Sequence, residues 1–563
     1  MRVLDAIAQI LKIEGAEYLP CYPTTGLIDA AAEVGIRPIV CRQERVGVGI
    51  ADGFSRTSGG RRLAVFAMQF GPGVENATAG IATAFADSVP LLLLPLGHPL
   101  TRAQVFPLFN SVRSLATITK AVESIVAPDQ TVDVMRRAVA AVKLGRPGPV
   151  VVEIPVDLST QAMSSTTLDY QPVVPVRAQG DPTAVDRAME ALVNAKRPVV
   201  YAGQGVLYSD ACAELLELAE RLNLPVMTSL EGKSAFPENH PLALGTGGPV
   251  LTGPISQLLP RADLIVGIGC SFTRHIMSVL LPPGTPLIQV TNDARDLNKS
   301  YWVDHPILGD AKLVLRQMLD SLRDRRTPSQ QRGREVEGEI AALRTSWITS
   351  WHHKLTSPAQ PMTPYRVITE FEAATDPDTT IVTHDSGSPR DQMIPFYKAT
   401  RPHGYIGWGK SHALGTGLGL IMGAKLAEPK KFCVNFMGDA AFGMTGMDLE
   451  TANREGLPIL TVVLKNSTMA IETETLVRSH ELYGTRNVGG DYVGVARALG
   501  CWAEQVADPN ALQDAFRRAR AETEDGRAAL LELITSEETE FAPRRLARVD
   551  AQPKADLDKS PTH

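Results

Sequence analysis

Short apolar runs recur along this chain, and segments with a helical pattern separate them. This alternation limits the possible folds more than any other feature of the sequence. Residues 63–68, 89–96 and 148–155 form such runs near the start, and two further series lie within residues 197–293 and 379–537. A continuous apolar run of this length is typical of a strand buried in a parallel sheet whose faces are covered by crossover helices. The sequence therefore predicts an α/β protein made of doubly wound parallel sheets.

The chain is too long for one hydrophobic core. Domains usually contain ~100 to 200 residues, so a chain of 563 residues is expected to form three or four. Residues 166–184 are rich in Pro and Thr without periodicity, so they mark a first linker. Residues 324–360 are charged and then rich in Trp and His, which predicts a surface helix and a second linker. We expect domains at 1–165, 182–325 and 358–540, followed by a mobile tail or lid at 541–563.

Composition argues against several functional classes. A net charge of -6 leaves no basic surplus of the kind that nucleic-acid binding requires. The longest apolar runs are far shorter than the ~20 residues that span a bilayer, and the N-terminus has the pattern of a folded helix rather than a signal peptide. The six cysteines are scattered and never form a CxxC pair, which is typical of free thiols in a reducing cytosol. We expect a cytoplasmic protein that binds neither nucleic acid nor membranes.

One local pattern points to a metal and a diphosphate. An apolar strand at 432–437 leads into Gly438 and Asp439, a helix follows, and a second apolar strand leads to Asn466. The carboxyl ends of parallel strands border the ligand crevice, so Asp439 and Asn466 can converge there. One charged and one neutral oxygen ligand suit Mg²⁺, which shares its coordination shell with phosphates and water. The helix after Asp439 would direct its first amides at the phosphates.

This pattern resembles the thiamine diphosphate (ThDP) signature of the superfamily that contains acetolactate synthases, pyruvate decarboxylases and oxalyl-CoA decarboxylases. The resemblance extends over residues 1 to about 540 and implies pyrimidine-binding, central and diphosphate-binding domains. It departs at Ala440, where the usual residue is Gly, a change that oxalyl-CoA and 2-hydroxyacyl-CoA enzymes also tolerate. By this resemblance Asp439, Asn466 and the main-chain oxygen of Thr468 hold Mg²⁺. The same resemblance implies that the cofactor contacts Gly438, Asp439, Ala440, Ala441 and Asn466.

Two further segments resemble other parts of the same superfamily. Residues 40–59 are similar to its pyrimidine-side segment, in which Glu44 ends a strand and shares a proton with the aminopyrimidine ring, so that the cofactor becomes its own base. Residues 408–427 are similar to the segment that bends the cofactor, with Leu414 as the apolar wedge and the main-chain carbonyl of His412 as an acceptor. Taken without this context, Glu44 also fits a surface or capping residue, and Leu414 fits a core leucine.

The resemblance also implies partners. Because the two halves of the cofactor site lie on different domains, they are expected to meet across a subunit interface, in a homodimer or a homotetramer. Some relatives hold ADP or a flavin in the central domain, and the sequence leaves open whether this chain holds either.

Details of the signature suggest a reaction. Residues 438–451 look closest to those of oxalyl-CoA decarboxylases and 2-hydroxyacyl-CoA lyases, whereas Gln69, Phe70 and residues 105–112 differ from the usual acetolactate synthase pattern. We expect a carbon–carbon lyase that cleaves a 2-hydroxyacyl-CoA, such as 2-hydroxyisobutyryl-CoA, to formyl-CoA and an aldehyde or ketone, and that also runs in reverse as a carboligase. Glu472 lies six residues after Asn466, where similar pyruvate-decarboxylase-like enzymes carry an acid. This resemblance makes it the candidate acid, although a solvated glutamate would fit the same pattern.

The substrate side of the site is predicted more loosely. Gln69, Phe70 and His98 are candidates from the first domain, with a structural role for His98 as the alternative. Cations for the CoA phosphates are candidates from the third domain and the tail, namely Arg390, Lys398, Arg401, Lys410, Arg544 and Arg545. Two other functions stay open: a 2-oxo acid decarboxylase or acetolactate-synthase-like transferase, and a non-catalytic regulatory protein that has kept the fold.

Overall fold

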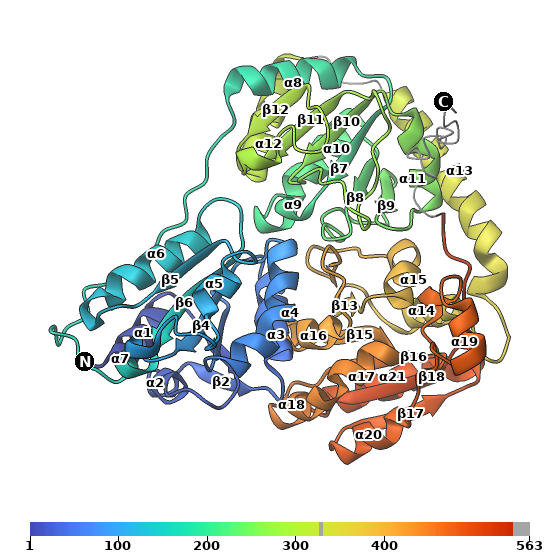
Figure 1. The fold of residues 1–563 in the computed structure, drawn as a ribbon. Coiled ribbons are helices and arrows are strands. Elements are labelled where there is room, and N and C mark those ends of the chain that lie inside the picture. Colours follow the sequence, from blue (N-terminus) through green and yellow to red (C-terminus); the bar gives the residue numbers. More distant parts are fainter. Residues whose placement is uncertain (326–329, 544–563) are drawn as a thin grey trace, which may run out of the picture.

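The computed structural model describes residues 1–325 and 330–543, which form three α/β units one after another along the chain (Figure 1). Each unit is built on a six-stranded sheet whose strands are all parallel. The predicted fold class is therefore confirmed. In Figure 1 the N-terminal unit lies at the lower left, the central unit at the top and the C-terminal unit at the lower right.

The N-terminal sheet has the strand order β2-β1-β3-β4-β6-β5. Its strands are β1 (Tyr18–Cys21), β2 (Arg37–Val40), β3 (Val65–Met68), β4 (Leu91–Gly97), β5 (Ala121–Ser124) and β6 (Pro149–Pro155). Its main helices are α1 (Val3–Ile13), α2 (Leu27–Glu33), α3 (Glu44–Thr57), α4 (Pro72–Ala86) and α6 (Thr131–Lys143). The chain leaves β1 on one side to form β2 and on the other to form β3, which opens a ligand crevice at the carboxyl ends of β1 and β3.

The central sheet has the order β12-β11-β10-β7-β8-β9, so its crevice lies between β7 and β10. Its strands are β7 (Pro198–Ala202), β8 (Val226–Thr228), β9 (Ala243–Thr246), β10 (Leu264–Ile268), β11 (Leu287–Thr291) and β12 (His305–Leu308). Its helices include α8 (Pro182–Asn194), α9 (Gln204–Tyr208), α10 (Cys212–Leu222), α11 (Gly253–Leu258) and α12 (Ala311–Ser321).

The C-terminal sheet has the order β14-β13-β15-β16-β18-β17, and its crevice lies between β13 and β15. Its strands are β13 (Thr380–His384), β14 (Tyr405–Ile406), β15 (Phe432–Gly438), β16 (Leu460–Lys465), β17 (Trp502–Val506) and β18 (Ala529–Ile534). Its helices include α14 (Pro364–Ala374), α15 (Ser388–Phe396), α16 (Thr416–Ala427), α17 (Asp439–Thr445), α18 (Leu449–Arg454), α19 (Val477–Tyr483), α20 (Tyr492–Ala498) and α21 (Leu512–Glu524).

The segment predicted as a surface helix and linker does more than connect two units. It forms α13 (Gln330–Leu355), which runs along the edge of the molecule from the central to the C-terminal unit (Figure 1). Its Ile340 is buried in the central core, while Trp347 stacks on Phe396 of the C-terminal unit and Trp351 packs against the same ring at a tilt. The first part of the helix thus packs on the central core and its last part on the C-terminal core. The many charged residues of the helix hide these two apolar contacts in the sequence.

The N-terminal and C-terminal units share one hydrophobic core, which joins α3 to α16. The two helices lie side by side at the centre of Figure 1. Their backbones approach so closely that a Cβ on Gly53 would lie 2.0 Å from the carbonyl oxygen of Leu420. Only glycine fits at such a contact. The packing fixes the first residue of α3, Glu44, relative to the C-terminal unit of the same chain.

Two further sequence predictions concern cysteines and membranes. All six cysteines are free thiols, and all except Cys212 are buried. Among the described residues, no helix combines the length and the apolar character needed to cross a membrane.

Candidate active site

Asp439 and Asn466 meet at the carboxyl ends of neighbouring strands. Asp439 begins α17 directly after β15, and Asn466 directly follows β16, which pairs with β15. Oδ2 of Asp439 accepts hydrogen bonds from the backbone amides of Asn466 at 3.1 Å and Ser467 at 3.3 Å. Oδ1 of Asn466 accepts from the amide of Thr468 at 3.1 Å. The three proposed metal ligands are therefore adjacent.

The donor set at this point fits a metal ion that is shared with phosphate. Oδ1 of Asp439 is buried and has no hydrogen-bond partner within residues 1–325 and 330–543, which is costly unless a ligand engages it. Burial also raises the pKa of this carboxyl. A Cβ on Gly438 would meet only Pro389, at 3.8 Å, so the backbone leaves space for a ligand. No group of three or more His, Cys, Asp or Glu in the described part of the chain could hold a metal, so a Mg²⁺ site here needs phosphate oxygens as well.

Glu44 is the candidate site residue of the N-terminal unit. It starts α3 rather than ending a strand, and only 3% of its surface is exposed. Its Oε2 accepts from Nδ2 of Asn76 at 3.2 Å. A buried carboxyl of this kind suits a proton shared with a ring nitrogen.

The pocket that contains Glu44 does not include the proposed metal ligands. Glu44 and Gln69 line an open pocket of about 420 Å³ whose far wall is the segment 444–448. That segment lies at the C-terminal end of α17, whereas Asp439 begins this helix. Neither Asp439 nor Asn466 lines the pocket. Within a single chain, Asp439 and Asn466 therefore lie outside the pocket that Glu44 lines.

The segment predicted to bend the cofactor is held from two sides. Asp385, which follows β13 and is fully buried, accepts from the amides of Gly415 and Gly417, each at 2.9 Å. Burial raises the pKa of Asp385 to about 6. Leu414 is half-buried against the shared core, and its carbonyl accepts from the guanidinium of Arg45. His412 is exposed. The neighbour of Glu44 thus touches the predicted wedge residue of its own chain.

Glu472 lies on the loop that follows β16, six residues after the proposed metal ligand Asn466. It ends a short 3-10 turn (Ala470–Glu472) and is half-buried. Its neighbour Thr473 donates to the carboxylate of Glu537, beyond β18.

Three candidate substrate residues gather in the N-terminal unit. Gln69 lines the pocket of Glu44, and the rings of Phe70 and His98 pack together with centroids 4.8 Å apart. They follow β3 and β4, at the same edge of the sheet as Glu44. The sequence offered no signal for Glu153 of β6, which also lies beside this group. Its side chain contacts Gly97, the residue before His98: a Cβ added to Gly97 would lie 2.8 Å from it.

The candidate CoA cations do not form a cluster. Arg390 is buried, and its Nε donates to Oδ1 of Asp391 at 2.7 Å. Arg401 donates to the carbonyl of Thr380 at 3.1 Å. Lys398 and Lys410 pair with Glu372 and Glu231, at 3.7 and 3.1 Å. Each of the four described cations engages a different partner, so a shared phosphate site stays a prediction. Arg544, Arg545 and most of the predicted tail lie outside the described residues.

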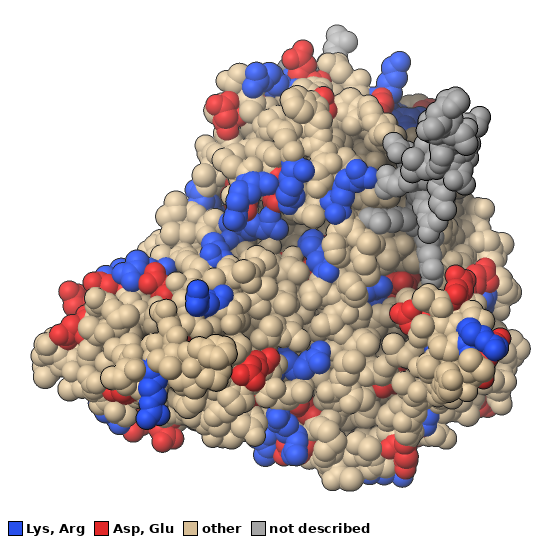
Figure 2. Space-filling view, in the orientation of Figure 1, with Lys and Arg blue, Asp and Glu red and all other residues tan. Residues whose placement is uncertain are grey.

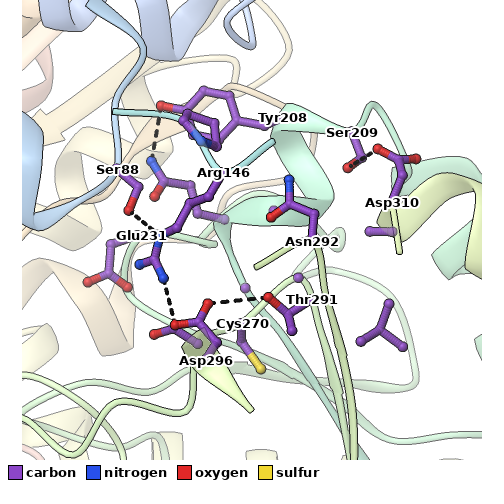
Figure 3. Close-up of a pocket in the computed structure, with 18 of the residues that line it drawn as sticks. Ser88, Arg146, Tyr208, Ser209, Glu231, Cys270, Thr291, Asn292, Asp296 and Asp310 are labelled. Carbon is purple, nitrogen blue, oxygen red and sulfur yellow. Dashed lines mark hydrogen bonds and ion pairs between the residues drawn. The ribbon is translucent and has the colours of Figure 1, made fainter. Parts of the chain in front are cut away.

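A large cavity opens at the carboxyl ends of β7 and β10, in the unit for which the sequence offered no candidate chemistry. It holds about 830 Å³ and is lined by the loops 203–205 and 269–273. Figure 3 shows Arg146, from the N-terminal unit, reaching Asp296 at 2.6 Å and Ser88 at 2.9 Å on its wall. Figure 2 shows basic side chains around the junction of the two units. The lining cations are Arg61, Lys143, Arg146, Arg177 and Lys410.

The sequence did contain a signal for this cavity. Glycines follow β7 and β10 directly, and their loops touch, since a Cβ on Gly203 would lie 2.4 Å from the carbonyl oxygen of Gly269. Such glycines let the two loops pack closely at a switch point, which is where ligands of doubly wound sheets bind.

Comparison with known protein families gives a match for each of the three units. Family models for thiamine pyrophosphate enzymes match the chain three times: the N-terminal TPP binding domain at residues 1–119, the central domain at 185–318, and the C-terminal TPP binding domain at 385–533. Together they cover well over half of the chain.

Similar curated proteins extend over nearly the whole chain. The “Probable acetolactate synthase large subunit” of Methanococcus aeolicus is 29% identical over 552 residues, which is 92% of this chain and 90% of that protein. The “Acetolactate synthase isozyme 3 large subunit” of Escherichia coli is 28% identical over 571 residues, 96% of each chain. These names do not support the predicted closeness to 2-hydroxyacyl-CoA lyases. The three family matches and the full-length relatives do show that this chain belongs to the thiamine pyrophosphate-dependent enzymes, with ThDP and Mg²⁺ as cofactors.

Proposed function

We propose that this enzyme makes or breaks a carbon–carbon bond next to the carbonyl of a 2-oxo acid, as a decarboxylase or an acetolactate-synthase-like transferase. The observation that carries the proposal is the similarity to acetolactate synthase large subunits over more than nine-tenths of the chain. Gln69 lines the pocket of Glu44, and Phe70 follows it in the chain. Both differ from the usual acetolactate synthase residues, which favours a different acceptor from that of those relatives.

The arrangement of cations also supports a small substrate. A CoA ester would need several cations grouped around its phosphates, whereas Arg390, Arg401 and Lys398 each engage a different partner. A 2-oxo acid carries only one carboxylate and needs no such cluster.

Each candidate residue would have a different role in binding or using the cofactor. When bound, ThDP supplies a carbanion equivalent that adds to carbonyls and stabilises the charge left by a broken bond. Asp439, Asn466 and the carbonyl of Thr468 would hold Mg²⁺ and through it the diphosphate. Glu44 would share a proton with the pyrimidine ring, Leu414 would support the bent cofactor, and the carbonyl of His412 would accept from it. Glu472 would deliver or remove a proton at the substrate.

A second copy of the chain would complete the site. Glu44 and Asp439 lie at opposite ends of α17, so a homodimer in which Glu44 of one copy faces Asp439 of the other is the smallest complete enzyme. Met444 and Met447, beside Glu44, are about half exposed, and Phe106 is 93% exposed. Exposed apolar groups of this kind favour a protein interface. A homotetramer would be a pair of such dimers.

The central cavity would hold a nucleotide. Its place at the switch point of a doubly wound sheet, its size and its basic walls suit an adenine nucleotide such as ADP, or a flavin. The buried free thiols favour the cytoplasm as the compartment of the enzyme.

The 2-hydroxyacyl-CoA lyase remains a second candidate, because residues 438–451 resemble such enzymes. The experiment that decides between them supplies the purified enzyme, ThDP and Mg²⁺ with pyruvate or with 2-hydroxyisobutyryl-CoA. We expect CO₂ from pyruvate, with or without a coupled product, and no acetone from the CoA ester. Acetone and formyl-CoA, with no CO₂ from pyruvate or other 2-oxo acids, would overturn the proposal. ThDP binding without turnover of either class would favour the regulatory alternative.

A further inference from the structure

The loop that carries the proposed metal ligands is strained. Ser467, between Asn466 and Thr468, has a φ of 57°, in the left-handed region that residues other than glycine seldom adopt. A backbone conformation of this kind persists only where the surrounding structure holds it in place. The loop therefore needs support from outside itself.

One support is Asp439, which begins α17 directly after the neighbouring strand β15, and the other is a segment further along the chain. Asp439 accepts from the amides of Asn466 and Ser467. On the opposite side, residues 486–488 run antiparallel to the loop, with a bridge between Thr468 and Asn487. The amide of Met469 donates to the carbonyl of Arg486 at 2.9 Å, and that of Val488 to the carbonyl of Ser467 at 3.2 Å.

The side chain of Arg486 adds a second layer to this support. It is 8% exposed, and its Nη1 lies within hydrogen-bond distance of three acceptors. These are Oγ1 of Thr468 at 3.3 Å, Oγ1 of Thr473 at 2.9 Å and Oε1 of Glu537 at 2.5 Å. One guanidinium thus joins the metal loop, the residue after Glu472, and the segment that follows β18.

Glu537 is a fixed anchor. The amide of Ser536, its neighbour, donates to the carbonyl of Met362 at 2.9 Å. On its other side Glu538 pairs with Lys354 of α13 at 2.7 Å. The carbonyl of Pro543 then accepts from Leu251 in the central unit, at 2.9 Å. The segment 536–543 is held at several points, so the ion pair with Glu537 restrains Arg486.

We infer that Arg486 is a positioning residue for the metal loop and for Glu472, and that Glu537 holds it in place. The inference rests on the proposed metal site. Arg486 acts through Thr468, whose carbonyl is the proposed ligand, and through Thr473, which follows the proposed acid. Its loss would allow the strained loop to relax and would move the carbonyl of Thr468 away from the metal.

The test uses the full-length enzyme and measures Mg²⁺ binding by isothermal titration calorimetry in the presence of ThDP. Arg486→Met and Glu537→Ala are expected to weaken Mg²⁺ binding by roughly 10- to 100-fold, the usual cost of removing a group that orients a metal ligand. Glu538→Ala is the matched control, because it removes the neighbouring acid and its ion pair without touching Arg486, and its Mg²⁺ affinity should equal that of the wild type. Arg486→Lys, which keeps the charge but cannot reach three acceptors, should fall between.

The outcomes separate positioning from simple stability. If Arg486→Met and Glu537→Ala lower the thermal unfolding temperature as Glu538→Ala does and leave Mg²⁺ binding unchanged, the inference is overturned. If Asp439→Asn abolishes Mg²⁺ binding in the same assay, the proposed metal site stands even then. Weakened Mg²⁺ binding in both the Arg486 and Glu537 variants, but not in the control, supports the inference.

Discussion

The backbone amide of Asn466 donates to Oδ2 of Asp439 across 27 positions of sequence, at 3.1 Å. This contact occupies one carboxylate oxygen and leaves Oδ1 buried without a partner among the described residues. A buried, unpartnered carboxylate oxygen beside an amide oxygen is costly for an isolated chain and useful for one that binds a cation. We therefore expect the protein to be more stable when a cation occupies this site than when the site is empty.

Asp439→Asn should remove Mg²⁺ binding while leaving the fold intact. The amide keeps an oxygen for the amides of Asn466 and Ser467 but loses the charge that a divalent cation needs. We expect a loss greater than the roughly 10- to 100-fold that follows removal of a supporting residue. Calorimetric titration of Mg²⁺ with ThDP present measures it, and circular dichroism checks the fold. Unchanged Mg²⁺ affinity would move the metal site elsewhere.

Two inactive variants should restore activity when they are expressed together. Glu44→Gln should slow turnover by ~10²- to 10⁴-fold, the contribution of a positioned proton-transfer group, and Asp439→Asn should lack the metal. If the site forms between copies, a mixed dimer contains one intact site, and a random mixture should regain about a quarter of the wild-type activity. Activity at the level of the separate variants would show that each chain uses its own Glu44.

Glu472→Gln should leave ThDP and Mg²⁺ binding unchanged and lower turnover by at least ~10²-fold, because it removes a proton donor at the substrate. Steady-state kinetics with the preferred substrate measures the effect. Glu474→Gln, two residues away and exposed, is the control and should behave as the wild type. A normal rate in the Glu472 variant would exclude that residue from the mechanism.

Gly53→Ala should destabilise the contact between α3 and α16. The new Cβ would lie 2.0 Å from the carbonyl of Leu420, so the helices must move apart, at a cost of about 1–3 kcal/mol or more. Gly338→Ala, in α13 and with nothing within 4 Å, should instead stabilise by about 0.5–1 kcal/mol. Urea unfolding of both variants tests this, and equal effects would contradict the close packing.

Stability should fall as the pH rises from about 4 to 6, in part through Asp448. Burial raises the pKa of this carboxyl from its ordinary 3.8 to about 6. Between these values the unfolded chain loses the proton while the folded chain keeps it, so up to about 3 kcal/mol of stability is lost as the pH passes through the window. Asp448→Asn, which keeps an oxygen for the amide of Arg42, should lack this contribution. Denaturant unfolding at several pH values measures it, and identical slopes for both proteins would contradict the shift.

Much of this protein could be predicted from local patterns. The apolar runs that became β4, β10 and β15 predict parallel sheets, because a strand buried on both faces must be apolar along its length. Asp439 and Asn466 could be paired because parallel strands end at one edge of the sheet. Both predictions depend only on the chain near each residue and on general rules of strand geometry.

Tertiary structure decided what depends on distant partners. The sequence offered Arg390 as a contact for a ligand, but only the packing of the elements around it decided that its side chain is buried. The charged residues of α13 hid the tryptophans that pack on the C-terminal core. The position of Glu44 near the C-terminal end of α17 follows from the contact of α3 with α16. The support of the metal loop by Arg486 joins segments up to 69 positions apart. A residue type and its neighbours fix which element forms, whereas burial and charge pairing depend on which elements the folded chain brings together.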